Sequence, residues 1–154
     1  MAHIHEKIDF TTDVFVVHGD RVLMRKHEKY HIWLGVGGHI ELNEDPIEAA
    51  VREVKEEVGL DVRIIDTRMY TGTEEERAEL IPPMGMNRHR VSDTHEHISL
   101  YYAALCDSDE VIPENVDDEW KWCKSEELEE LEGILPGIVF YAREALRLAG
   151  EKRN

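Results

Sequence analysis

Two short runs of β-branched and apolar side chains open the chain. Residues 9–17 (DFTTDVFVV) and 21–26 (RVLMRK) flank a His-Gly-Asp turn, a pattern that predicts a β-hairpin. The same reading predicts further extended segments at residues 33–41, 61–72, 96–105 and, as a short strand, 120–123.

The segment between residues 46 and 58 has the period of an amphipathic helix. At about 100° per residue, one apolar stripe contains Ile47, Ala50, Val51, Val54 and Val58. Asp45 suits the N-cap, with Pro46 in the first turn and Glu48 three residues after the cap. Gly59 suits a left-handed C-cap, so we expect the helix to end at residue 58.

Two more helices are predicted near the C-terminus. Residues 125–132 can form one with Ser125 as N-cap and with Leu128 and Leu131 facing inward. Residues 134–148 form the closing helix, whose inward face holds Ile134, Ile138, Tyr141, Ala145 and Leu148. Strands with one helix between them and another at the end predict an α/β sandwich. The polar stretch 73–94 is a long connection, and such connections are usually functional or disordered.

Three glutamates gather on one side of the first predicted helix. Glu53, Glu56 and Glu57 fall within an arc of about 100° opposite the apolar stripe. Such a face is ordinarily only solvated. Here Arg52 and Lys55 lie off the arc, and a glycine-rich turn (Gly35, Gly37, Gly38) precedes the helix. Clustered carboxylates next to accessible carbonyl oxygens favour a site for Mg²⁺ or Mn²⁺.

The spacing of these residues matches a known motif. Residues 38–60, GHIELNEDPIEAAVREVKEEVGL, follow the pattern G-x5-E-x7-R-E-aliphatic-x-E-E-x-G-aliphatic. This is the Nudix box, so the chain resembles the Nudix hydrolases. The resemblance implies an α/β/α sandwich with a mixed β-sheet, here a single domain over residues 1–154 with an insertion at about 73–94. It also implies metal-dependent hydrolysis of a pyrophosphate bond in a nucleoside diphosphate linked to another moiety.

The resemblance also assigns roles to individual residues. Glu53, Glu56 and Glu57 would bind Mg²⁺, with Mn²⁺ as its substitute, and the Gly38 carbonyl would be a further ligand. Arg52 would orient the glutamates as part of the catalytic set, with Glu44 in a supporting structural position. Where the family often has proline before the two box glycines, this chain has Val36, a departure that bears on the local turn geometry.

The general base is left open by the sequence. Glu56 and Glu57 are candidates, as is the segment 94–97 (THEH). There His95 and His97 would share one face of a strand and Glu96 the other. The alternative for this segment is an ordinary surface strand.

The substrate is the least determined feature. The downstream marks of the ADP-ribose and dinucleoside-polyphosphate branches are not found, which leaves a nucleoside triphosphate, oxidised or not, as the default. The alternatives are ADP-ribose or another nucleotide derivative, or a non-catalytic nucleotide-sensing domain. We predict substrate contacts from Arg88 and Arg90, in a basic island of the polar stretch, and from His95 and Glu96. The alternative for the basic island is a solvated loop.

The composition of the chain limits the classes of molecule that it is expected to bind. A net charge of -16 argues against a nucleic-acid polymer but not against a small nucleotide bridged by metal. No apolar run approaches the roughly 18 residues of a membrane span, and the first ten residues lack a signal-peptide core. Cys106 and Cys123 have no metal or redox spacing, which favours reduced thiols in the cytoplasm. The frequency of symmetric dimers makes a homodimer plausible, and Trp33, Tyr101 and Trp122 are expected in the core.

Overall fold

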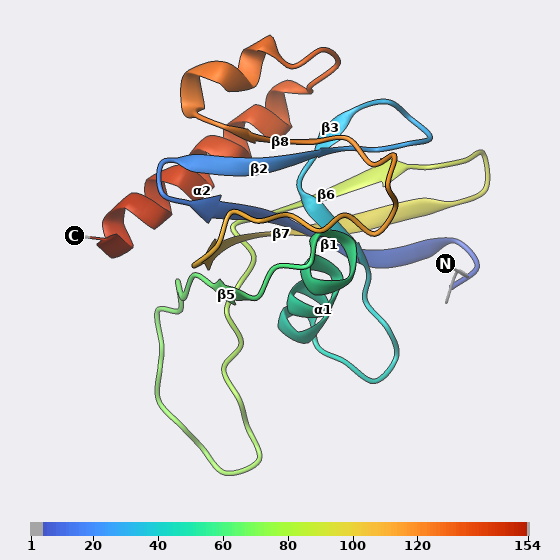
Figure 1. The fold of residues 1–154 in the computed structure, drawn as a ribbon. Coiled ribbons are helices and arrows are strands. Elements are labelled where there is room, and N and C mark those ends of the chain that lie inside the picture. The colour runs from blue at the N-terminus through green and yellow to red at the C-terminus, as the bar shows by residue number, and fades with distance from the viewer. Residues whose placement is uncertain (1–4, 154) are drawn as a thin grey trace.

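The computed structural model describes residues 5–153 and places one long helix on each face of a mixed β-sheet (Figure 1). The strands are β1 (Ile8–His18), β2 (Arg21–Lys26), β3 (Trp33–Leu34), β4 (Val36–His39), β5 (Val62–Ile64), β6 (Gly85–Arg90), β7 (Glu96–Cys106) and β8 (Trp120–Cys123). The helices are α1 (Pro46–Val58), the 3₁₀ helix η1 (Ser125–Glu130) and α2 (Pro136–Arg153). The α/β/α sandwich with a mixed sheet is confirmed.

The two longest strands, β1 and β7, form the centre of the sheet. They run parallel, in a register that pairs Ile8 with Glu96 and continues to Val17 with Leu105. All other strand pairs are antiparallel. The outer edge of β1 is shared by β4 and β2, and the outer edge of β7 by β6 and β5. Consequently β4 and β6 flank the N-terminal halves of the two central strands.

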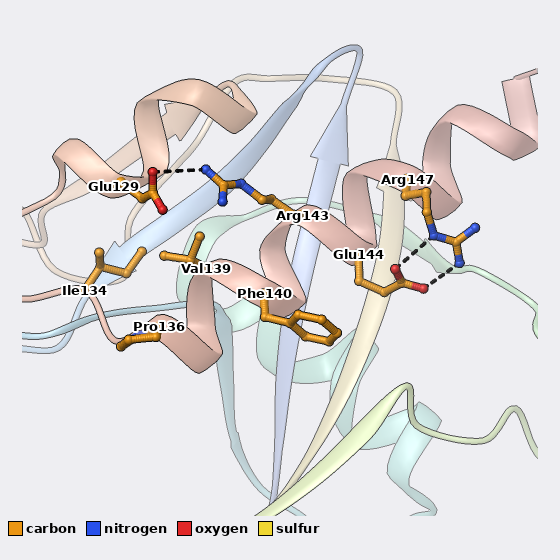
Figure 2. A pocket seen from close by; sticks show the side chains of 8 residues that line it. All are labelled: Glu129, Ile134, Pro136, Val139, Phe140, Arg143, Glu144 and Arg147. Atoms are coloured by element: carbon orange, nitrogen blue, oxygen red, sulfur yellow. Dashed lines mark hydrogen bonds and ion pairs between the residues drawn. The ribbon is translucent and has the colours of Figure 1, made fainter.

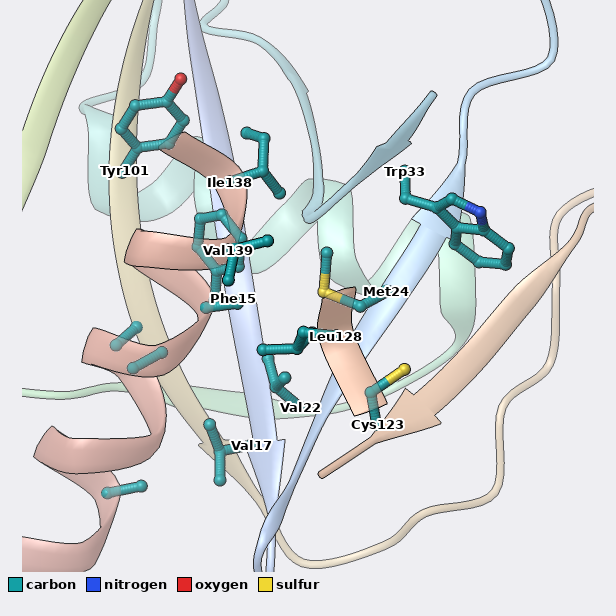
Figure 3. Packing of buried hydrophobic residues seen from close by; sticks show 14 of the residues in the cluster. Phe15, Val17, Val22, Met24, Trp33, Tyr101, Cys123, Leu128, Ile138 and Val139 are labelled. Carbon is teal, nitrogen blue, oxygen red and sulfur yellow. The ribbon is translucent and has the colours of Figure 1, made fainter. Parts of the chain in front are cut away.

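Each face of the sheet has its own hydrophobic core. Phe15 and Val17 of β1 point toward α2 and pack with Leu128, Ile138 and Val139 (Figure 3). The alternate residues of β1 point toward α1 and pack with Val54 and Val58. Fully burying a side chain as large as Phe15 stabilises the fold by about 1.5–3 kcal/mol. The expected core aromatics are buried: Trp33 and Tyr101 on the α2 side, Trp122 on the α1 side.

Helix α1 has the predicted bounds because both of its ends are capped. The Asp45 side chain accepts hydrogen bonds from the backbone of Ile47 and Glu48, and the Glu48 carboxylate accepts one from the Asp45 backbone. Gly59 ends the helix in the left-handed conformation, with φ of 71°. A capped start of this kind stabilises a helix by about 1 kcal/mol.

The orientation of α1 departs from the predicted stripe. Val51, expected to face inward, is 37% exposed, whereas Ala49 is fully buried. The helix is therefore turned so that Ala49, Ala50 and Glu53 face the protein. As a result Glu53, predicted on the arc opposite the apolar stripe, is buried against the protein.

One predicted strand is shorter than expected, and one strand was not predicted. The segment predicted at residues 61–72 pairs only over β5, after which the Ile65 amide makes one more bond to the Ala103 carbonyl. Strand β6 was missed because its residues are largely exposed and show no apolar alternation. It occupies the end of the polar stretch 73–94, which otherwise contains only an isolated bridge between Glu74 and Arg77 among the described residues.

The C-terminal helices also differ in detail. The residue that precedes η1 is Lys124, and Ser125, predicted as the cap, instead accepts a hydrogen bond from Arg143 Nε at 3.2 Å. Leu128 and Leu131 do face inward. Helix α2 begins and ends later than the predicted 134–148. In the described part of the chain, no helix has the combination of length and apolar content that crossing a bilayer requires.

Candidate active site

Arg52 organises the acidic face of α1. Its guanidinium donates to both Glu44 oxygens, from Nη2 to Oε1 at 2.6 Å and from Nε to Oε2 at 3.0 Å. The same group reaches the His39 carbonyl at 3.0 Å. Its Nη1 donates to Glu53 Oε1 at 3.0 Å and to Glu56 Oε2 at 3.2 Å. Residue 52 lies off the carboxylate arc, but its long side chain reaches across the helix to Glu53 and Glu56, as expected of a residue that orients them.

Glu53 is buried directly beneath a glycine of β4. A Cβ added to Gly38 would lie 2.5 Å from Glu53 Oε1, so only glycine leaves room for this carboxylate. Burial raises the pKa of Glu53, and the hydrogen bond from Arg52 opposes that rise. The absence of a side chain at residue 38 thus brings a carboxylate against the backbone of the strand.

Glu57 is the least compensated carboxylate of the three. Its Oε2 is buried and accepts no hydrogen bond from the described residues. The nearest cation is Arg25, whose Nη1 lies 3.7 Å away and whose Nη2 is 3.3 Å from Asp118 Oδ2. Burial raises the pKa of Glu57 to about 8, and Arg25 only partly opposes this. A cation next to Glu57 would therefore be strongly favoured.

Glu56 differs from its two neighbours in being open to water. Its side chain is 52% exposed, and the contact with Arg52 is the ion pair described above. Lys55, the other basic residue of the helix, pairs with Asp61 at 3.1 Å and takes no part in the carboxylate cluster. The face of α1 therefore combines two buried carboxylates with one that can move.

The glycines before the helix lie in a strand and not in the predicted turn. Gly37 and Gly38 belong to β4, where they pair with Asp13 and Thr12 of β1. Val36, which replaces the family's frequent proline, pairs with Val14 and is fully buried. Valine suits this position because the residue is part of a sheet and of the core.

The residues predicted to contact substrate do not converge on one point. Arg88 pairs with Glu96 through Nε–Oε2 at 2.6 Å, and Arg90 is opposite Glu96 in the β6–β7 ladder. His95 turns to the other face of the sheet, where its Nε2 lies 3.0 Å from Asp9 Oδ2. The predicted separation of His95 and His97 from Glu96 across the strand is confirmed.

Several polar residues of the strands around the site escaped the sequence analysis. They are Asp9, Asp13 and Arg25 of the first hairpin and His39 of β4. A signal existed for two of them: Asp9, Thr11 and Asp13 are polar residues at every second position of one predicted strand, so they share one face. This polar half of a strand face could have been recognised as something other than core. His39 and Arg25 join the site only through strand pairing.

A surface groove lies on the other side of the sheet from the carboxylate cluster. It encloses about 530 Å³ beside α2 and η1, and its lining includes Ile134, Val139, Phe140 and Arg143 (Figure 2). Helix α2 covers the sheet face opposite α1. This groove therefore takes no part in the carboxylate cluster.

The burial of Asp13 should make the stability of the protein depend on pH. It is 9% exposed, its Oδ1 has no hydrogen-bond partner among the described residues, and burial raises its pKa to about 7. Between about pH 4 and 7 the folded protein therefore holds a proton that the unfolded chain releases, so stability falls as pH rises through this window. We expect Asp13→Asn to remove up to about 3 kcal/mol of the fall between pH 5 and pH 8. Urea unfolding of both proteins at these two pH values measures it, and equal pH dependence would reject the assignment.

Comparison with known proteins identifies the family. The NUDIX domain family matches residues 8–143 of the chain. The chain belongs to the Nudix family. A NUDIX-family hydrolase from Clostridium perfringens is 36% identical, with a TM-score of 0.79 over 92% of this chain and 97% of that one. The protein is thus a Nudix hydrolase, an enzyme acting on pyrophosphate bonds of nucleotides.

More distant Nudix structures share the fold. An Ap4A hydrolase from C. elegans is 20% identical, with a TM-score of 0.65 over 92% of this chain and 98% of that one. A MutT NUDIX hydrolase from Burkholderia pseudomallei is 19% identical, with a TM-score of 0.61 over 93% and 98%. None of the curated proteins compared matches the chain.

Proposed function

We propose that this Nudix hydrolase cleaves a pyrophosphate bond of a nucleoside triphosphate, oxidised or not, with Mg²⁺ held by Glu53, Glu56, Glu57 and the Gly38 carbonyl. Mn²⁺ would substitute for Mg²⁺. The observation that supports the proposal most strongly is the buried Glu57 oxygen without a hydrogen-bond donor, on the helix face that also carries Glu53 and Glu56.

The donor set fits a hard divalent cation. Mg²⁺ prefers oxygen ligands, and three carboxylates lie on this face of α1. Arg52 offsets the charge of Glu53 and Glu56, whereas Glu57 is stabilised by the more distant Arg25 and by the Gly37 backbone, which do not prevent burial from raising its pKa. A divalent ion would stabilise the ionised form of Glu57 and offset its burial. The half-exposed Glu56 can turn toward such an ion by releasing Arg52.

Each residue of the site would then have its own role in an in-line attack by water on phosphorus. When bound, the metal lowers the pKa of water and neutralises charge on the phosphoryl oxygens. Arg52 holds Glu53 and Glu56 in place from Glu44 and the His39 carbonyl. Glu56 is open to water and can accept the proton. His95 is a weaker candidate because it is buried against Asp9.

The charge and the cysteines of the chain support a small nucleotide partner and a cytoplasmic location. The chain's net charge of -16 supports a small nucleotide over a nucleic-acid polymer. Cys106 and Cys123 are both buried and form no disulfide, which supports a cytoplasmic location.

Arg88 and Arg90 give a test of how the substrate is held. Arg88 must release Glu96 before it can bind a phosphate, whereas Arg90 has no ion pair at 4.0 Å or less among the described residues. We expect Arg88→Ala and Arg90→Ala to raise KM several-fold with little change in kcat, since each removes binding energy common to ground and transition states. Steady-state kinetics measure this. If KM is unchanged for every substrate cleaved, neither arginine contacts the substrate.

The substrate class is tested by kcat/KM over a panel. It would contain the common and oxidised nucleoside triphosphates, ADP-ribose, NADH, dinucleoside polyphosphates and nucleotide sugars, each with Mg²⁺. A preference for triphosphates of at least about tenfold supports the proposal. A comparable preference for ADP-ribose or a dinucleoside polyphosphate would overturn the substrate while leaving the reaction class intact.

A further inference from the structure

A second group of metal-binding side chains lies on the opposite face of the sheet from α1. Asp9 of β1 is surrounded by His95, by His97 of β7 and by His39 of β4. Asp9, His95 and His97 each offer one ligand atom, and these atoms all lie within 4.8 Å of one another. In the described part of the chain, this is the one such group of three.

Both ring nitrogens of His95 face hydrogen-bond acceptors. Its Nδ1 faces the Glu6 carbonyl oxygen at 3.2 Å, and its Nε2 faces Asp9 Oδ2 at 3.0 Å. Both partners are acceptors, and a neutral imidazole has one proton to donate. A proton given to Glu6 leaves the Nε2 lone pair directed at a carboxylate, an arrangement that a cation between the two atoms would stabilise. Metal-bound histidines commonly donate their other nitrogen to a backbone carbonyl in this way.

Asp9 is positioned as a second ligand. It is 1% exposed, and its Oδ1 accepts a hydrogen bond from the His5 backbone at 2.9 Å. Its Oδ2 lies 3.0 Å from His95 Nε2 and 3.4 Å from His39 Nε2. Ligands at about 2.05 Å around a tetrahedral ion are about 3.3 Å apart, so these distances are already near the edges of such a tetrahedron.

We propose that Asp9, His95 and His97 bind a zinc-type divalent metal ion on the α2 face of the sheet, with His39 as the fourth ligand. Imidazole nitrogens with one carboxylate suit Zn²⁺, whereas the all-oxygen set on α1 suits Mg²⁺. The ion would join β1, β4 and β7. Since His39 follows Gly38 and its carbonyl binds Arg52, the site would also fix the strand that carries the Gly38 carbonyl.

The alternative is an ion pair between a doubly protonated His95 and Asp9, with no metal. A metal-binding experiment distinguishes the metal site from the ion pair. The untagged chain, stripped with EDTA, would be titrated with Zn²⁺ against a chromophoric chelator. The double variant Glu56→Gln/Glu57→Gln is titrated as well, because it weakens the α1 site. We expect one tight Zn²⁺ equivalent in that variant, and a tetrahedral visible spectrum when Co²⁺ replaces Zn²⁺.

His97→Gln and, separately, His95→Gln in the same background should weaken Zn²⁺ binding by at least about 100-fold and abolish the Co²⁺ spectrum. His31→Asn, which removes an exposed histidine at positive φ, is the matched control and should change neither. Circular dichroism shows whether each variant folds, and Zn²⁺ should raise Tm only where the site is intact. No tight Zn²⁺ in the parent, or tight Zn²⁺ that survives both histidine variants, would overturn the proposal.

Discussion

Glu57→Gln is expected to lower kcat by about 10³-fold or more, the largest effect of any single change in the site. The substitution keeps the shape of the side chain but removes the charge of its buried carboxylate. Metal-ion catalysis contributes several kcal/mol of transition-state stabilisation, and each 1.4 kcal/mol is a factor of about ten in rate. Glutamine keeps a carbonyl oxygen but not the negative charge, so the variant would bind a divalent cation much more weakly.

The control for this prediction is Glu132→Gln. Glu132 is exposed and follows η1, so its loss changes the net charge equally without touching α1. Initial rates with saturating substrate and Mg²⁺, together with Mg²⁺ titrations, distinguish the two variants. A Glu57→Gln protein that retains more than about a tenth of the wild-type kcat would show that Glu57 is not a ligand of the catalytic metal.

Gly38→Ala is expected to lower kcat about 100-fold while leaving the protein folded. The new Cβ would lie 2.5 Å from Glu53 Oε1 and 2.6 Å from Glu53 Cδ, so the carboxylate has to move away. The end of a side chain can shift at modest energetic cost, but a metal ligand displaced by about 1 Å loses its geometry. Activity and Mg²⁺ affinity should therefore fall, with Tm changed by only a few degrees.

Gly37→Ala is the comparison variant, because it should affect the stability of the fold and not the carboxylate. There the new Cβ would lie 1.9 Å from the Thr12 carbonyl oxygen, which belongs to the backbone of β1. Since β1 is central, the clash should destabilise the fold by about 3 kcal/mol or more. Thermal unfolding and kinetics of both variants test the pair. Equal loss of stability in the two would mean that Gly38 serves the fold and not the carboxylate.

The sequence predicted best what local chemistry determines. Helix α1 has its predicted bounds because Asp45 and Gly59 cap it. Strands β1, β2 and β7 were found within one residue at each end, since their apolar runs are long or sharply bounded. Strand β6 was missed because backbone pairing with β7, and not apolar burial, holds it. The rotation of α1 was also missed, because it depends on the space above Gly38.

The site, like the fold, was predicted only where it depends on residues close together in sequence. The spacing of Glu53, Glu56 and Glu57 identified the acidic face from the sequence alone. The group formed by Asp9 and the histidines could not be predicted, because it requires the parallel register of β1 and β7 that pairs Asp9 with His97. Residues 86 or more apart in sequence meet there only through the sheet.

Whether the carboxylates of α1 hold a divalent metal that drives hydrolysis is tested most directly by turnover of the best panel substrate. Turnover would be measured after EDTA treatment and after readdition of Mg²⁺, in the wild type and in the Glu56→Gln/Glu57→Gln variant. We expect EDTA to abolish turnover, and Mg²⁺ to restore it in the wild type but not in the variant. Metal-dependent binding of a nucleotide without any turnover, or turnover that the variant retains, would contradict this expectation.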